Sequence, residues 1–459
     1  MIVMKFGGTS VEDAPALRRV ATIVRRELPR SPLVVVSACA GVTNSLAQLA
    51  EQARQRDIRG VLRTIREIRH RHEQIAHDLL KPPRAGKVVR HLETLAGELE
   101  TLARGVAALG ELTPRSQDAF LSFGERMSSP ALQEYLLQTG IRSRLVSARE
   151  YMITDASHTK AVPIAGSVSR GLRKEVVPLL GSNRVVLTQG FIGATPDGIP
   201  TTLGRGGSDF SASYIGALLH AKEIQIWTDV DGILTADPTL VPGARNVPIL
   251  TFREASELAY FGARVLHPDT IIPAVKRNIP VVVLNSRKPR WPGTRVVAHR
   301  PKKRNGAVQS IAYKEGVTLL NIVSTRMFLA HGFLERVFDV FHKYGTVVHT
   351  VATSDVSITA AVDDRSHLDA LVRELRTFAS VSLAERKAII CVVGEGLRHA
   401  PGTAARVLSA VGNVDINMIS AGASEINISL AVAESSLPIA VRRLHAEFFP
   451  SVNLRRGEE

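Results

Sequence analysis

Two glycine-rich segments carry the residues best suited to chemistry in this sequence. The first, K-F-G-G-T-S (Lys5 to Ser10), follows a run of apolar residues, and the second, T-L-G-R-G-G-S-D (Thr202 to Asp209), precedes one. Glycines let backbone N–H groups approach an anion closely, and the N-terminus of a following helix favours negative charge. Lys5 adds a compact positive charge, and Arg205 adds a planar fork that suits a carboxylate or phosphate. Two such anion cradles indicate an enzyme that brings two anionic substrates together.

Neither segment is a P-loop or a dinucleotide-binding fingerprint. The first has no G-K-[ST] ending and does not follow the G-x-G-x-x-G spacing. An ordinary strand-to-helix turn would also explain the first segment. A capped helix after a flexible loop would explain the glycines, Ser208 and Asp209 of the second, but it leaves Arg205 without a purpose. These structural alternatives stay open on the residues alone.

Three further segments carry polar groups with weaker signals. Glu125, in S-F-G-E, is suited to a substrate ammonium, and Thr43 and Ser37 offer hydroxyls, although each is more often a cap or a surface group. W-T-D-V-D-G, which begins at Trp227, is suited to a nucleotide ribose and base. Its D-x-D-G also resembles a poor calcium loop, but the Glu that ends such a loop is absent. The run Arg69–His72 is interpreted as a solvated helix face.

The elements that must position these residues follow from the apolar pattern. Residues 1–6 and 33–37 are predicted as buried strands with a helix over 14–28 between them, which begins a parallel α/β sheet. Residues 45–140 are predicted to be rich in helix. Strands return at 185–189, 223–228 and 280–284, and a helix is predicted over 210–219. Residues 289–304 have the composition of a linker.

The last third of the chain contains a weak internal repeat. Two copies, beginning near Val317 and Ala388, each read strand, helix, strand, strand, and their helices open at Gly332 and Gly402. That order is half of a ferredoxin-like plan, so the repeat predicts a pair of small α+β domains.

Composition narrows the class of protein. At roughly 150 residues per domain, 459 residues correspond to about three domains. No stretch approaches eighteen apolar residues, and two cysteines cannot form a disulfide framework, so we expect a cytoplasmic protein that does not enter the membrane. The net charge of +15 indicates acidic partners. Because aromatic residues make up 5% of the chain, single-stranded nucleic acid is a weak candidate partner, and phosphorylated or carboxylated small molecules are favoured.

Taken together, the motifs resemble those of the aspartate kinases, members of the amino acid kinase superfamily. The matching segments run through residues 1–300 in the family's order: K-F-G-G-T-S, S-A-C-A-G-V-T-N, S-F-G-E, T-Q-G-F-I-G, T-T-L-G-R-G-G-S-D, W-T-D-V-D-G and F-G-A-R-V-L-H-P. The repeat resembles the family's two ACT domains in G-F-L-E-R-V-F, V-A-T-S-D-V-S and I-S-A-G-A-S-E-I-N-I-S.

The resemblance implies an α/β amino-acid-kinase domain over 1–300, with a mainly parallel sheet sandwiched by helices. Two ferredoxin-like ACT domains follow. A linker and the first ACT domain would occupy 301–385, with completion by 448–459, and the second ACT domain would occupy 386–447. The chain looks monofunctional because it ends after the ACT pair. ACT domains in this family pair across subunits, so a homodimer or higher homo-oligomer is expected.

The implied reaction is MgATP-dependent phosphorylation of the β-carboxylate of L-aspartate, the first step toward lysine, threonine and methionine. By the resemblance, Lys5 and Asp209 are catalytic, and Mg²⁺ is bound through the phosphates with no protein metal ligand. The substrate would contact Thr43, Glu125, Arg205, Gly206, Gly207 and Ser208. The ATP positions are Lys5, Phe6, Gly7, Gly8, Ser37, Thr228, Asp229, Arg264 and Val265. An amino-acid effector would contact Met327, Gly332, His349 and Ser354.

Three positions depart from the family's pattern. Arg264 stands where Lys is usual, Leu234 replaces a Tyr of the nucleotide loop, and His349 replaces an Asp that lysine-inhibited relatives carry. Since a neutral imidazole pairs poorly with an ammonium, we expect weak sensitivity to lysine or a different effector.

The alternatives come from several classes. A superfamily relative that acts on glutamate or uridylate is disfavoured by Glu125 and the ACT pair. A catalytically inactive amino-acid sensor would need a broken catalytic set, whereas Lys5, Arg205 and Asp209 are all present. The hypothesis that the protein binds nucleic acid is supported only by its net charge of +15.

Overall fold

The computed structural model describes residues 1–181, 183–262, 266–300, 308–324 and 332–450. The chain divides into two compact units. Met1–Ile233 and Val265–His299 form the first, and Leu234–Arg264 and Arg300–Glu459 form the second. Each unit is described by itself below.

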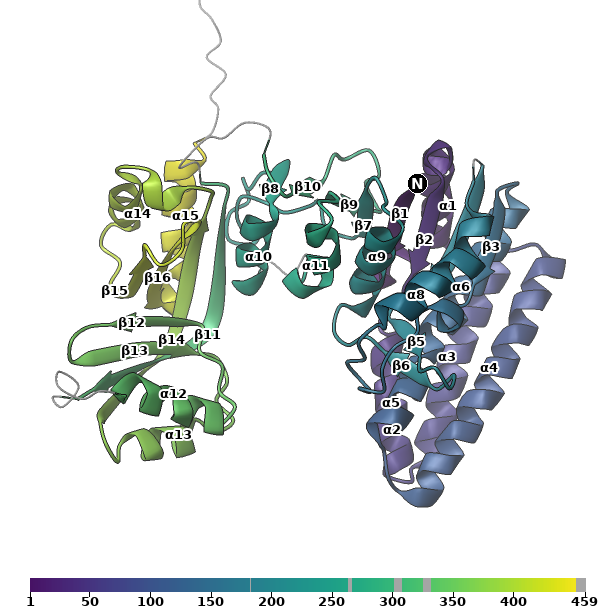
Figure 1. Cartoon of the computed structure of the whole chain (residues 1–459), viewed down its shortest axis with the longest axis horizontal. Helices are drawn as coiled ribbons and strands as arrows, with labels where there is room; N and C mark the ends of the chain where they lie inside the picture. Colours follow the sequence, from purple (N-terminus) through teal and green to yellow (C-terminus); the bar gives the residue numbers. More distant parts are fainter. Residues whose placement is uncertain (182, 263–265, 301–307, 325–331, 451–459) are drawn as a thin grey trace, which may run out of the picture. The chain divides into compact units, whose positions relative to one another are not determined.

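A twisted sheet forms the centre of the first unit (Figure 1). Its strands lie in the order β3 (Arg142–Val146), β4 (Arg184–Gln189), β2 (Pro32–Val36), β1 (Ile2–Phe6), β7 (Ile224–Thr228), β9 (Val281–Asn285) and β10 (Thr294–Val297). The pairs from β3 to β9 are parallel, and β10 runs antiparallel to β9. Both faces of β1 and β2 are buried, as their mainly apolar sequences predict, and the one charged residue of β1, Lys5, is buried with them. The predicted α/β class with a mainly parallel sheet is confirmed.

Helices cover this sheet and extend beyond it. Among them, α2, α3 and α4 contact one another as a helical layer (Figure 1). Helix α9 packs against β1, β2 and β7, whereas α6 packs against β2, β3 and β4. The helices of this unit are α1 (Ala14–Glu27), α2 (Val42–Arg54), α3 (Ile58–Leu79), α4 (Pro82–Leu109), α5 (Pro114–Leu121), α6 (Phe123–Gln138), α7 (Ala148–Tyr151), α8 (Ala165–Gly171), α9 (Gly207–Leu218) and α11 (Pro268–Lys276).

A small antiparallel hairpin stands apart from the main sheet. It consists of β5 (Ile192–Ala194) and β6 (Pro200–Thr202), and it leads directly into the second glycine-rich segment. A β-bridge between Ile153 and Ala194 joins β5 to the segment that follows α7. The hairpin therefore places the loop at Gly204–Gly206 beside the carboxyl end of the sheet, through short connections on both sides.

In the second unit, both repeats contribute to a single antiparallel sheet (Figure 1). Its order is β12 (Thr350–Thr353), β13 (Ser357–Val362), β11 (Ser310–Val323), β14 (Ser380–Val393), β16 (Asn427–Ala433) and β15 (Ile416–Ala421). Helices α12 (Phe333–Lys343) and α13 (Leu368–Leu375) accompany the first repeat, and α14 (Thr403–Val411) and α15 (Leu437–Phe448) the second. This unit also contains β8 (Ile249–Thr251) and α10 (Phe252–Tyr260). The predicted pair of small α+β domains is confirmed.

The two repeats exchange strands through β11 and β14. The first half of β11 pairs with the second half of β14, and its Ile311 lies in the core of the second repeat. The second half of β11 carries Leu320 into the core of the first repeat. The part of the sheet that belongs to each repeat therefore includes half of a long central strand, β11 or β14, from the other repeat. The tail expected to complete the first ACT domain, residues 448–459, begins at Phe448, the last residue of α15, and residues 451–459 lie outside the described part of the chain.

Candidate active site

A cavity of about 510 Å³ lies at the carboxyl ends of β1 and β2 and beside the start of α9. Ligands of open parallel sheets bind at this edge, beyond the carboxyl ends of the strands. Ten of the predicted site residues line the cavity: Lys5, Gly8, Ser37, Thr43, Glu125, Arg205, Gly206, Gly207, Ser208 and Asp209. The structure thus brings together residues from segments that are far apart in the sequence.

Lys5 and Asp209 form an ion pair inside this cavity. Lys5 Nζ lies 2.6 Å from Asp209 Oδ1, and their side chains are 11% and 17% exposed. Lys5 lies on β1, whereas Asp209 lies in the first turn of α9. Gly206, the N-cap of α9, has φ of 69°, a conformation that glycine adopts without strain. A Cβ on Gly7 would lie 3.5 Å from Lys5 Nζ, so the glycine pair leaves room around the ammonium.

Glu125 is a buried carboxylate without a full set of partners. It is 3% exposed, and its Oε2 has no hydrogen-bond partner among the described residues. Burial raises the pKa of Glu125 to about 8. The Glu125 carboxyl is therefore mostly protonated at pH 7 in the empty site, and a cation that enters the cavity would favour its ionised form.

Close backbone approach shapes the wall made by α9. A Cβ on Gly190, at the end of β4, would lie 2.7 Å from Ser208 Cβ, and a Cβ on Gly207 would lie 2.6 Å from the Phe191 ring. These approaches hold the start of α9 against residues 190–191, and the N–H groups of Gly207 and Asp209 donate to the carbonyl oxygens of Gly204 and Gly206. Ser37, which directly follows β2, and Thr43, in the first turn of α2, also line the cavity and offer hydroxyls.

Some of the residues predicted to bind the nucleotide line the cavity, and others do not. Gly8 and Ser37 line the cavity, whereas Phe6 is fully buried and stacks on Trp227 with 5.9 Å between ring centroids. Thr228 ends β7 and Asp229 follows it, and the Thr228 hydroxyl donates a hydrogen bond to Asp229 Oδ1. Next to them, Asp231 binds Lys288 Nζ at 2.6 Å and also accepts from Asn285. Arg264 and Val265 lie outside the described residues.

Sequence reasoning missed several residues that line the cavity. Cys39 lies in the matched segment S-A-C-A-G-V-T-N, but burial raises the pKa of its thiol to about 12, so it is no nucleophile. Phe191 lies in the matched segment T-Q-G-F-I-G, whereas Gln117 and Thr159 reach the cavity from segments with no motif of their own. Only their place in the fold makes them site residues. The other lining residues that were not predicted are Ala38, Ala40, Gly41, Leu121, Thr202 and Gly204.

In the second unit, His349 is enclosed by polar partners. Its Nδ1 lies 2.9 Å from Tyr260 Oη, and its Nε2 lies 2.7 Å from Asp363 Oδ1 and 2.9 Å from Lys314 Nζ. Ser354 shares a hydrogen bond with Ser357 Oγ, and Gly332 caps α12 with φ of 86°. Met327 lies outside the described residues.

Two searches of the described residues gave negative results. No group of three or more His, Cys, Asp and Glu side chains is placed to hold a metal ion. In the same residues, no helix combines the length and the apolar character needed to cross a membrane.

Comparison with known proteins places these features in a family. The amino acid kinase family model matches residues 1–285, and an ACT domain model matches residues 390–448. Chloroplastic aspartokinase 3 of Arabidopsis thaliana is 40% identical, over 97% of this chain and 81% of its own. Lysine-sensitive aspartokinase 3 of Escherichia coli is 35% identical, over 98% of this chain and 99% of its own.

Solved structures agree with this placement. Aspartokinase III of E. coli in complex with lysine and aspartate superposes with a TM-score of 0.82 at 32% identity, covering 98% of this chain and 99% of that one. The same enzyme with aspartate and ADP gives 0.81 at 33% identity, covering 98% and 100%. The chain belongs to the amino acid kinase family. Within that family it is a member of the aspartokinases, the group that its motifs predicted.

Proposed function

We propose that this chain transfers the terminal phosphoryl group of ATP to the β-carboxylate of L-aspartate, which yields 4-phospho-L-aspartate and ADP. The observation that carries the proposal is the Lys5–Asp209 ion pair in one cavity with the unpaired carboxylate of Glu125. The pair provides a held cation for phosphate, and Glu125 provides a site for an ammonium. A nucleotide phosphate would use the cation, and the ammonium of an amino acid would use the Glu125 carboxylate.

The chemistry requires positioning and charge stabilisation more than proton transfer. An aspartate β-carboxylate has a pKa of about 3.9, so it is already a nucleophile at pH 7 without a general base. Lys5 would neutralise charge on the transferring phosphoryl group, and the N–H of Gly8 would add a hydrogen bond, whereas the Gly7 N–H donates to the Trp227 carbonyl oxygen at 2.9 Å. Asp209 would hold the Lys5 ammonium in place, 2.6 Å away. Catalysis then comes from aligning two anions that repel each other in water.

Recognition of the amino acid uses both of its ends. Arg205 would take the α-carboxylate as a fork, and Glu125 would take the ammonium. Thr43 and Ser208 would supply hydroxyls and Gly206 a backbone N–H. The Gly207 N–H donates to the Gly204 carbonyl oxygen at 3.0 Å, so Gly207 would contribute by shaping the cavity wall. These groups line the same cavity, so they can act on one small substrate.

ATP would lie along the edge formed by β1 and β7. Its contacts would be Lys5, Gly7, Gly8, Ser37, Thr228, Asp229, Arg264 and Val265, and Phe6, whose ring is fully buried, would take part through its backbone. Mg²⁺ commonly binds through substrate phosphates with few protein ligands, and here it would neutralise the β- and γ-phosphate oxygens.

The second unit would regulate this reaction. E. coli aspartokinase III, a neighbour of this chain in structure, has been solved in complex with lysine. We infer feedback control by an amino acid through the ACT domains, with Met327, Gly332, His349 and Ser354 in the effector region. We also infer a cytoplasmic homodimer or higher homo-oligomer.

Hydroxylamine trapping of the acyl phosphate tests the reaction directly. L-Aspartate with ATP should give the hydroxamate, and L-glutamate should not. Lys5→Ala should abolish the product, whereas Lys174→Ala, a change at a lysine whose side chain is 82% exposed, should leave it unchanged. Hydroxamate from glutamate at an equal rate would indicate a relative with another substrate. Failure of wild-type protein to form hydroxamate, while it still binds ATP and aspartate, would support the sensor instead.

A further inference from the structure

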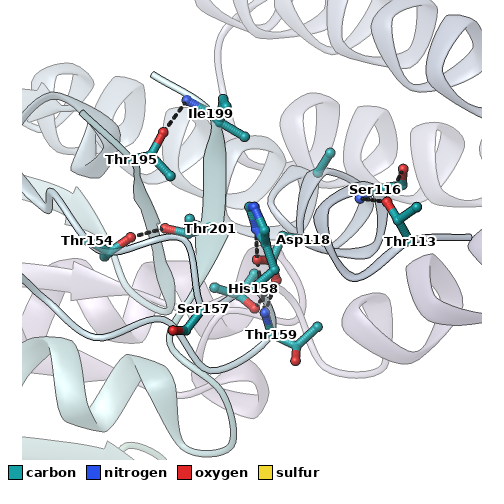
Figure 2. Close-up of polar contacts among 12 residues, drawn as sticks. Thr113, Ser116, Asp118, Thr154, Ser157, His158, Thr159, Thr195, Ile199 and Thr201 are labelled. Carbon is teal, nitrogen blue, oxygen red and sulfur yellow. Dashed lines mark hydrogen bonds and ion pairs between the residues drawn. The ribbon is translucent and has the colours of Figure 1, made fainter. Parts of the chain in front are cut away.

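Asp118 is a buried carboxylate that the proposed reaction does not use. It is fully buried on α5, the short helix that precedes the helix of Glu125. Figure 2 shows it between the loop of His158 and Thr159 and the start of the second glycine-rich segment. A carboxylate is stable in such a place only when its oxygens are fully hydrogen-bonded.

Both oxygens of Asp118 are engaged by groups from two other segments. Oδ2 lies 2.8 Å from His158 Nδ1, and Thr202 Oγ1 donates to Oδ1 at 2.5 Å. The backbone N–H of Thr159 donates to both oxygens at 3.0 Å (Figure 2). One carboxylate thus joins α5, the loop at 158–159 and the end of β6.

Two of these partners are themselves part of the cavity wall. Thr159 and Thr202 line the cavity that contains Glu125 and Arg205. A Cβ on Gly204 would lie 3.2 Å from the Thr159 carbonyl oxygen, so this loop packs closely on the turn that precedes Arg205. The loop is also tied to β6 by the bond from Ala161 N to the Thr202 carbonyl, at 2.9 Å.

Thr159 holds an unfavourable backbone conformation. Its φ is 71°, in the left-handed region that a β-branched residue rarely adopts. Such a residue keeps this conformation only when its surroundings hold it there. Since Asp118 accepts the Thr159 N–H with both oxygens, Asp118 is the group that holds it.

We propose that Asp118 is a positioning residue for the amino-acid substrate. It holds Thr159 in the left-handed conformation and thereby fixes the wall on which Gly204 and Arg205 rest. Arg205 is then pre-organised to take the substrate α-carboxylate. The inference rests on the proposed function, and it concerns the aspartate half of the site rather than the ATP half.

Steady-state kinetics of the full-length enzyme test the proposal through a split between two KM values. Asp118→Asn should raise the KM for aspartate about 10-fold, the effect expected when one hydrogen bond of a charged group is lost, and leave the KM for ATP within about twofold. Asp118→Ala should raise the KM for aspartate further. Asp57→Ala is the matched control, because Asp57 caps α3 through Gly60 N and does not line the cavity. It should lower stability without moving either KM.

A rescue experiment separates positioning from a merely structural role. Glycine adopts a φ of 71° without strain. In an Asp118→Asn background, Thr159→Gly should therefore lower the KM for aspartate most of the way back to the wild-type value. The single Thr159→Gly variant completes the double-mutant cycle. A folded Asp118→Asn or Asp118→Ala enzyme with an unchanged aspartate KM would overturn the proposal, as would a loss that Thr159→Gly does not recover. If the wild type forms no aspartyl hydroxamate, the proposed function itself fails. If the wild type forms aspartyl hydroxamate and the Asp118 variants have the wild-type KM for aspartate, only the positioning role of Asp118 fails.

Discussion

The Lys5 ammonium and the Asp209 carboxylate form an ion pair, with 2.6 Å between Nζ and Oδ1, although more than two hundred residues separate them in the chain. Asp209 therefore holds the cation that we assign to the phosphoryl group. We expect Asp209→Asn to lower kcat by about 10²-fold, a loss typical of an electrostatic group near the transferring charge. Stopped hydroxamate assays at saturating substrates measure this.

The control for that substitution is Asp197→Asn, at the exposed turn between β5 and β6. It should retain the wild-type kcat. An Asp209→Asn enzyme with wild-type kcat would contradict the role given to the ion pair.

The raised pKa of Glu125 gives the aspartate reaction a pH dependence. Below about pH 8 the carboxyl of the free enzyme is neutral and cannot pair with an ammonium. The kcat/KM for aspartate should therefore rise about tenfold per pH unit and level off near pH 8. Glu125→Gln should remove this rising limb, and kcat/KM profiles between pH 5.5 and 9 would reveal it. An identical limb in the variant would show that another group titrates.

The same group affects stability with a predictable sign. The folded-state pKa of Glu125 is raised above the ordinary value near 4.5, so the folded protein binds this proton more tightly than the unfolded chain does. That stabilisation is complete at acid pH and is lost as pH rises toward 8. Glu125→Gln stays neutral, so its Tm should exceed that of the wild type by a margin that grows from pH 5 to 8. A margin that shrinks over this range would refute the assignment.

The close approach of β4 and α9 can be tested with a pair of glycine substitutions. Gly190→Ala would place a Cβ 2.7 Å from Ser208 Cβ and 2.9 Å from Ser208 Cα, which forces the first turn of α9 to move. We expect a lower Tm and a lower kcat/KM for aspartate. Gly97→Ala, in an open position on α4, should instead stabilise by about 0.5–1 kcal/mol with unchanged kinetics. Equal changes in Tm and in kcat/KM for the two variants would show that the close approach of Gly190 to Ser208 affects neither stability nor activity.

His349 leads to an expectation about regulation. Its imidazole is 7% exposed and both nitrogens have partners, so it offers little to the ammonium of an effector. We expect millimolar lysine to inhibit weakly. Rate measurements across lysine and threonine titrations would check this, and strong inhibition by lysine alone would refute it.

Much of the fold was predictable because its causes are local. Mainly apolar segments predict β1, β2, β4, β7 and β9, and each lies within about a residue of its expected range. The glycine-rich segments indicate where the chain must turn closely at the sheet edge. The motifs, read together, predict the aspartokinase family, which the comparisons confirm. Lys5, Arg205, Asp209 and Glu125 could be singled out because their residue types stand beside such turns.

Tertiary structure decided what depends on contacts between distant segments. The pattern of one strand does not say which strand lies beside it, so the place of β7 next to β1 and the strand exchange between β11 and β14 come from the fold. The Asp118 network is of the same kind, since no motif surrounds His158 or Thr159. Local propensity and spacing are properties of neighbours in the chain, whereas a buried carboxylate finds its partners only when packing brings them within 3 Å.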